Sequence, residues 1–93
     1  MVNLLGKSIL VVDDAYSMRR LVQSYLQEAG YTVHLAESVL IAMQQIEKHK
    51  PNLVIADWMM PSVDGLQLVR AIRDHPEFRR LPVIFCSAKC GKN

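Results

Sequence analysis

The fold is decided by one stretch of sequence, Asp57-Trp58-Met59-Met60-Pro61-Ser62-Val63-Asp64-Gly65. The apolar run 53–56 before it is short enough to be a buried strand, which would carry the Asp57 carboxylate to the rim of a sheet. Pro61 lacks a backbone N–H and cannot lie in a central strand, so the chain has left the sheet by that point. Asp64-Gly65 is a turn signal, and Asp64 is also a good N-cap for the helical pattern that follows. The stretch therefore predicts a strand, an exposed acid, a loop and a helix.

Two further strand ends carry polar side chains. Asp13-Asp14 follows the continuous apolar run 9–12, which is typical of a strand buried on both faces of a parallel sheet. Ser87 follows the apolar run 83–86. In parallel α/β sheets, functional sites lie outside the carboxyl ends of the strands. We therefore expect these polar residues to converge with Asp57 at one rim, although each alone is also explained by an ordinary turn or helix cap.

Strands and helices alternate along the chain. Apolar runs predict strands over 8–12, 31–36, 53–56 and 81–86, and helical spacing predicts helices over 16–29, between Ser38 and Pro51, and over 65–74. The second helix is expected to be capped by Ser38 and to bury the apolar residues of its inner face, Leu40, Ala42, Met43 and Ile46. The alternation predicts right-handed crossovers and a parallel sheet, with the strand over 31–36 at an edge.

Three carboxylates at one rim imply a definite chemistry. Like charges that lie close together cannot all ionise cheaply, so either one pKa rises or a cation binds. A hard divalent ion held by a few carboxylates and several waters suits Mg²⁺, and its open positions can hold a phosphoryl oxygen. Asp57 would then be the nucleophile that attacks phosphorus, and the Ser87 hydroxyl would hydrogen-bond a phosphoryl oxygen.

Composition excludes several other classes of protein. The 93 residues carry a net charge of +2 with acidic and basic residues interspersed, so no nucleic-acid-binding footprint is present. No apolar run approaches the ~18 residues of a membrane span and no signal peptide is found, which makes the cytoplasm the expected location. Cys86 and Cys90 lack a second Cys or His pair at metal-binding spacing and are expected to be ordinary thiols. The three histidines, His34, His49 and His75, are expected at the surface.

Together these features resemble the response-regulator receiver domain, in its CheY-like form, over about Ser8 to Ala88. The motifs that carry the resemblance are Val11-Val12-Asp13-Asp14, Ser17-Met18-Arg19-Arg20, Asp57-Trp58-Met59-Met60-Pro61-x-x-Asp64-Gly65, and Leu81-Pro82-Val83-Ile84 leading to Ser87-Ala88. The resemblance implies a flavodoxin-like α/β fold of three layers, with a parallel sheet in strand order 2-1-3-4. It also implies a switch of two-component signalling rather than a turnover enzyme.

The resemblance assigns a role to each polar residue at the rim. Asp57 would be the phosphoacceptor, receiving a phosphoryl group from a histidine kinase or a phosphotransfer protein in a Mg²⁺-dependent reaction. Asp14 would ligate the ion directly and Asp13 chiefly through water. Asp57 itself and the backbone carbonyl of Met59 would complete the protein ligands. Ser87 would be the switch hydroxyl, and the phosphorylated form would act on an output partner that the sequence does not identify.

The sequence departs from the family pattern after the fourth strand. Residues 1–93 match one receiver domain without the family's last helix, strand and helix, and without the lysine that follows the fifth strand; Lys89 does not match that lysine. Strand four would then be an exposed edge, and apolar residues of the first strands and first helix would lose a covering helix. We expect either self-association, by dimerisation or swapping through the strand-four edge, or a fragment of a longer protein.

Two alternative functions remain open at this point. A receiver without its last third would act as a phosphorylation-independent interaction or self-assembly module. A metal-dependent phosphatase with an aspartate nucleophile, like the haloacid dehalogenases, would place a second Asp two residues after the nucleophile as general acid. Met59 occupies that position here, which disfavours the phosphatase.

Overall fold

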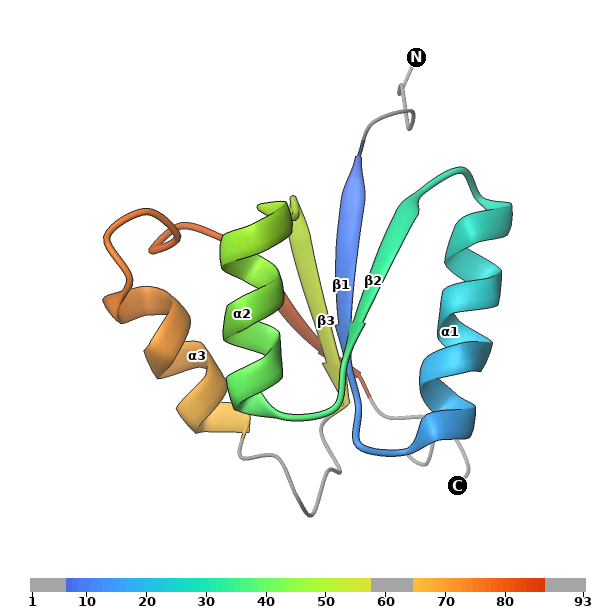
Figure 1. Ribbon diagram of the computed structural model, residues 1–93, viewed down its shortest axis with the longest axis horizontal. Helices are drawn as coiled ribbons and strands as arrows, with labels where there is room; N and C mark the ends of the chain where they lie inside the picture. The colour runs from blue at the N-terminus through green and yellow to red at the C-terminus, as the bar shows by residue number, and fades with distance from the viewer. Residues whose placement is uncertain (1–6, 58–64, 87–93) are drawn as a thin grey trace.

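Four strands form one parallel sheet in the computed structural model, which describes residues 7–57 and 65–86 (Figure 1). The strands are β1 (Ser8–Val12), β2 (Thr32–Ala36), β3 (Leu53–Asp57) and β4 (Val83–Cys86), arranged in the order β2-β1-β3-β4. The helices are α1 (Tyr16–Glu28), α2 (Val39–His49) and α3 (Gly65–Asp74). Figure 1 shows α1 on one side of the sheet and α2 and α3 on the other, so the predicted three-layer fold and strand order are confirmed. None of these helices is long and apolar enough to cross a membrane.

The strand β1 is buried on both faces, as its apolar run predicts. Leu10 and Val12 belong to the main hydrophobic core, and Ile9 and Val11, which alternate with them, are 3% and 2% exposed. The other fully buried members of this core are Ala42, Ile46, Val54, Ala56, Leu68 and Ile72. Complete burial of one large aliphatic side chain contributes about 1.5–3 kcal/mol. This packing holds β1 beside β3, and so sets the position of the residues that follow both strands.

The other face of the sheet is only partly covered. α1 packs on β1 and β2, and none of its residues is fully buried. Leu21 on α1 and Ile84 on β4 are 47% and 50% exposed. The expectation of exposed apolar side chains is therefore correct for the first helix. It is wrong for the first strand, because α1 packs against β1 and shields Ile9 and Val11.

Local sequence signals account for most of the element ends. The Ser38 hydroxyl accepts a hydrogen bond from the Ile41 N–H at 3.2 Å, which confirms the predicted cap of α2. Gly30 follows α1 with a φ of 102°, a conformation that glycine adopts without steric cost. β2 and β4 begin at Thr32 and Val83, slightly later than predicted. The expected helix cap at Asp64 and the thiol of Cys90 lie outside the described residues.

The predicted burial of Leu40 is wrong. Its side chain is 69% exposed, whereas Ala42 and Ile46 of the same helix are completely buried. Ala42 and Ile46 are four residues apart and share one face of α2, but Leu40 lies about 200° around the helix from Ala42. The inner face of α2 therefore excludes Leu40, which points to the solvent.

The predicted surface location of the histidines is only partly correct, because His34, His49 and His75 are all half-buried. His34 on β2 and His49 at the end of α2 are half-buried, and their rings stack with centroids 3.8 Å apart and an interplanar angle of 11°. Burial, followed by repulsion from His49, lowers the pKa of His34 below its ordinary value. The pair forms because the last turn of α2 packs against β2, a contact between segments 15 residues apart that periodicity does not reveal.

Candidate functional site

The candidate site lies at the rim formed by the carboxyl ends of the strands. Asp13 and Asp14 follow β1, and Asp57 is the last residue of β3. The register pairs Val12 with Ala56, so the first acid after β1 lies beside the acid that ends β3. This arrangement brings together acids that are 43 and 44 positions apart in the chain, as the strand pattern predicts.

Asp13 is the most buried of these acids. The residue is only 4% exposed, and its Oδ1 accepts a hydrogen bond from the Ala15 N–H at 2.9 Å. Its own N–H donates to the Ala36 carbonyl at 3.0 Å, which extends the pairing of β1 with β2 by one residue. Both bonds hold the start of the β1–α1 connection in place, and the bond from the Ala15 N–H has the pattern of an Asx turn.

The charges at the rim interact unfavourably. Burial raises the pKa of the Asp13 carboxyl above its ordinary value, and the nearby Asp57 and Asp14 carboxylates raise it further. The hydrogen bond from Ala15 and the positive charge of Arg19 act in the opposite direction but do not cancel these effects. The predicted crowding of acids is therefore present, and a cation at the rim would relieve it.

The donor chemistry of the rim fits a hard divalent cation such as Mg²⁺, which prefers carboxylate and carbonyl oxygens. In the described ranges, however, no three His, Cys, Asp or Glu side chains are arranged so that they could hold a metal ion. Met59 and Ser87 lie outside the described residues. The magnesium ligands and the switch hydroxyl named from the sequence therefore stay predictions.

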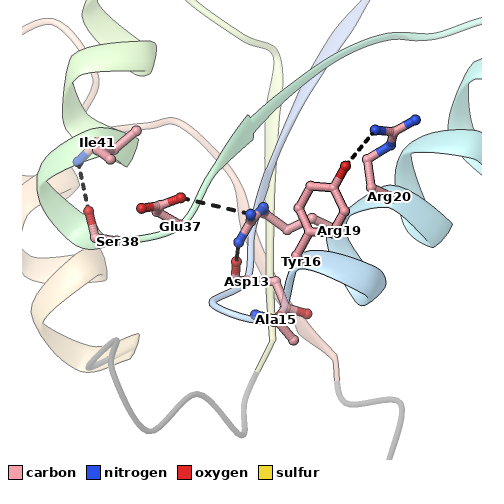
Figure 2. Close-up of polar contacts among 8 residues, drawn as sticks. All are labelled: Asp13, Ala15, Tyr16, Arg19, Arg20, Glu37, Ser38 and Ile41. Carbon is pink, nitrogen blue, oxygen red and sulfur yellow. Dashed lines mark hydrogen bonds and ion pairs between the residues drawn. The ribbon is translucent and has the colours of Figure 1, made fainter.

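Arg19 is a residue of this site whose position the sequence did not reveal. Figure 2 shows its guanidinium reaching from α1 to the end of β1 and to the residue after β2. Its Nη1 donates to the main-chain carbonyl of Asp13 at 2.8 Å, and its Nη2 lies 3.8 Å from Glu37 Oε1. The only sequence signal is that Arg19 stands six residues after Asp13, one turn into a helix that begins beside the acids.

Comparisons with known proteins agree with this geometry. The family model described as "Response regulator receiver domain" matches residues 9–93. The chain is 41% identical over 83 residues to the response regulator Rre1 of Synechocystis sp., covering 88% of this chain and 36% of that protein. It is 35% identical over 85 residues to the chemotaxis protein CheY-3 of Vibrio cholerae, covering 90% of this chain and 65% of that protein.

A solved structure shares the arrangement of elements as well as the sequence. The N-terminal domain of a response regulator receiver protein from Methanoculleus marisnigri superimposes with a TM-score of 0.82 at 31% identity. The match covers 90% of this chain and 68% of that structure. The chain thus spans about a third of Rre1, and about two thirds of CheY-3 and of the Methanoculleus marisnigri domain.

Proposed function

Because the chain belongs to the response regulator receiver domain family, we propose that it is a receiver of two-component signalling that accepts a phosphoryl group on Asp57. The observation that carries the proposal is the position of Asp57 at the end of β3, where its charge interacts with Asp13 beside it. A histidine kinase or a phosphotransfer protein would be the donor. Members of such systems meet in the cytoplasm, which is the location that we propose.

The proposed reaction is the attack of an Asp57 carboxylate oxygen on phosphorus. A new O–P bond forms as the bond between phosphorus and the donor imidazole nitrogen breaks, and the imidazole leaves with the electron pair and takes up a proton. Mg²⁺ would be held by Asp13, Asp14, Asp57 and the backbone carbonyl of Met59. When bound, the ion would neutralise the negative charge of the phosphoryl oxygens.

The product would be a switch rather than a step in a catalytic cycle. A phosphoryl group adds negative charge and three strong hydrogen-bond acceptors to the rim. We propose that the Ser87 hydroxyl donates to one of these oxygens and so transmits the phosphorylation state to an output partner. The domain would assist its own phosphorylation and dephosphorylation without turning over a separate substrate.

Intact-protein mass spectrometry tests the proposal directly. The chain is incubated with acetyl phosphate and Mg²⁺, and a mass gain of one phosphoryl group is expected. Asp57→Asn and a metal-free sample should abolish the gain. Asp74→Asn is the matched control, because Asp74 is an exposed acid at the far end of α3 and its substitution should leave the gain unchanged. No gain in the folded wild-type chain would contradict the proposal.

We also propose that two copies associate through β4. In the described part of the chain, β4 pairs with β3 alone, and Ile84 on this strand is 50% exposed. An exposed edge strand with an apolar side chain favours pairing with another strand. Light scattering should show a dimer that Ile84→Lys dissociates, with Leu40→Lys as the exposed control on the other side of the sheet. A monomer at high protein concentration would refute this association.

A further inference from the structure

Arg19 makes a set of contacts that the phosphoacceptor chemistry does not explain. Its side chain is 11% exposed although it carries a full charge, and it reaches two strand ends at once. The bond to the Asp13 carbonyl is 2.8 Å long, and the approach to the Glu37 carboxylate is 3.8 Å (Figure 2). A charge is buried this far only where hydrogen bonds and counter-charge compensate the loss of water.

The bond to Asp13 is made to a structurally important atom. The carbonyl of Asp13 belongs to the peptide unit that joins Asp13 to Asp14. A charged donor on this oxygen forms a strong, directional hydrogen bond and fixes the orientation of that peptide plane. The direction in which the Asp14 side chain leaves the backbone depends on this plane, so the bond from Arg19 constrains this acid through the main chain.

The remaining contacts of the same segment complete the anchoring. The Asp13 N–H is held by the Ala36 carbonyl at 3.0 Å, and the Asp13 carboxylate is held by the Ala15 N–H at 2.9 Å. Arg19 holds the carbonyl of Asp13. The N–H, the carbonyl and one carboxylate oxygen of this residue therefore each have a partner, and Arg19 supplies the one that comes from the helix.

We propose that Arg19 is a positioning residue for a divalent cation at the acid rim, acting through the Asp13–Asp14 peptide, with Glu37 as its counter-charge. This inference rests on the proposed function, because it presumes that the rim binds Mg²⁺. Groups that orient metal ligands from outside the coordination shell typically change metal affinity by 10–100-fold when they are removed. Arg19 would therefore contribute to metal affinity although it carries the same sign of charge as the metal.

The sign of the effect separates positioning from simple electrostatics. A positive charge near the rim repels Mg²⁺, so a purely electrostatic role predicts that Arg19→Gln binds Mg²⁺ more tightly than the wild type. The positioning role predicts the opposite, a weakening by about 10-fold or more. Arg19→Lys keeps the charge but cannot hold both Asp13 and Glu37 with a planar fork, so its affinity should fall between those of the wild type and Arg19→Gln.

A Mg²⁺ titration followed by backbone amide NMR signals measures these affinities without relying on phosphorylation. Arg20→Gln is the matched control, because Arg20 is the neighbouring arginine and donates to the exposed Tyr16 hydroxyl at 2.9 Å instead of to the acids. It removes the same charge and should change the Mg²⁺ affinity less than twofold. The rate of phosphorylation of Arg19→Gln by acetyl phosphate should return to within a few-fold of the wild-type rate when Mg²⁺ is saturating.

The possible outcomes are distinct. If the wild type binds Mg²⁺ and Arg19→Gln binds it equally or more tightly, the role of Arg19 is overturned and the proposed function is left intact. An absence of Mg²⁺ binding by the wild type would overturn both. If circular dichroism shows that Arg19→Gln is unfolded, Arg19→Lys carries the test, and wild-type affinity in that variant would overturn the inference.

Discussion

Truncation of Ile46 tests the packing that places the two acid-bearing strands side by side. Ile46 is completely buried between α2 and the sheet, in the same core as Leu10 and Val54. Ile46→Ala removes three carbon atoms, which at about 0.8 kcal/mol each is a loss of about 2.4 kcal/mol in transfer free energy. The cavity left behind adds to this loss, so we expect a total destabilisation of about 3–4 kcal/mol, inside the usual range for such substitutions.

The expected loss is large compared with the stability of a domain of this size. At about 0.05–0.15 kcal/mol per residue, 93 residues give a free energy of unfolding of about 5–14 kcal/mol. Urea denaturation should therefore show a clearly lower midpoint with an unchanged slope, and the melting temperature should fall by about 15–25 °C.

Leu40→Ala is the matched control on the same helix. Leu40 is 69% exposed, so its truncation should change the free energy of unfolding by less than about 0.5 kcal/mol. The helical pattern in the sequence placed both residues on the inner face, and the structure separates them. Equal losses for the two variants would refute the described orientation of α2 and the reasoning built on it.

Three further substitutions test the rim and its surroundings. The pKa of Asp13 is raised in the folded state, so ionisation of this carboxyl destabilises the fold as the pH rises from 3.8 through that raised value. Asp13→Asn should therefore raise the free energy of unfolding at neutral pH in the absence of metal. The same substitution should abolish the rise in melting temperature that Mg²⁺ causes in the wild type. Because the pKa of His34 is lowered in the folded state, the unfolded chain binds more protons than the folded chain as the pH drops below 6.5, and the free energy of unfolding should fall. In His34→Phe, the urea midpoint should no longer show this part of the pH dependence. Gly65→Ala would place a Cβ 2.7 Å from the Phe85 ring, and should cost about 1–3 kcal/mol in chemical denaturation unless Phe85→Leu is made with it. An undiminished stability of Gly65→Ala alone would show that the ring moves aside freely.

The sequence was sufficient for the order of elements because each element is specified locally. The apolar run 9–12 is continuous, and both faces of β1 are indeed buried. Ser38 caps α2 and Gly30 follows the end of α1, each through the conformational preference of a single residue. The alternation of strands and helices then left a parallel sheet as the physically favoured arrangement, and the observed order β2-β1-β3-β4 agrees with the family resemblance.

The details that sequence periodicity could not supply all depend on contacts between distant segments. Leu40 is apolar and fits a helical pattern, but the direction in which α2 packs places it in solvent. His34 and His49 are polar, yet the packing of α2 on β2 stacks them together. Ile84 lies in an apolar run, but half of its surface is exposed because α1 packs on β1 and β2.

The candidate site divides in the same way between sequence and structure. By itself, the sequence determined that Asp13, Asp14 and Asp57 lie at the carboxyl ends of strands of one parallel sheet, because such strand ends share a rim. Only the tertiary structure decided how these acids are held. The burial of Asp13, the unfavourable interaction of its charge with Asp57, and the reach of Arg19 to the Asp13 carbonyl depend on the register of β1 with β3 and on where α1 begins. Residue order specifies which groups arrive at a rim, and packing specifies their distances, exposure and charge.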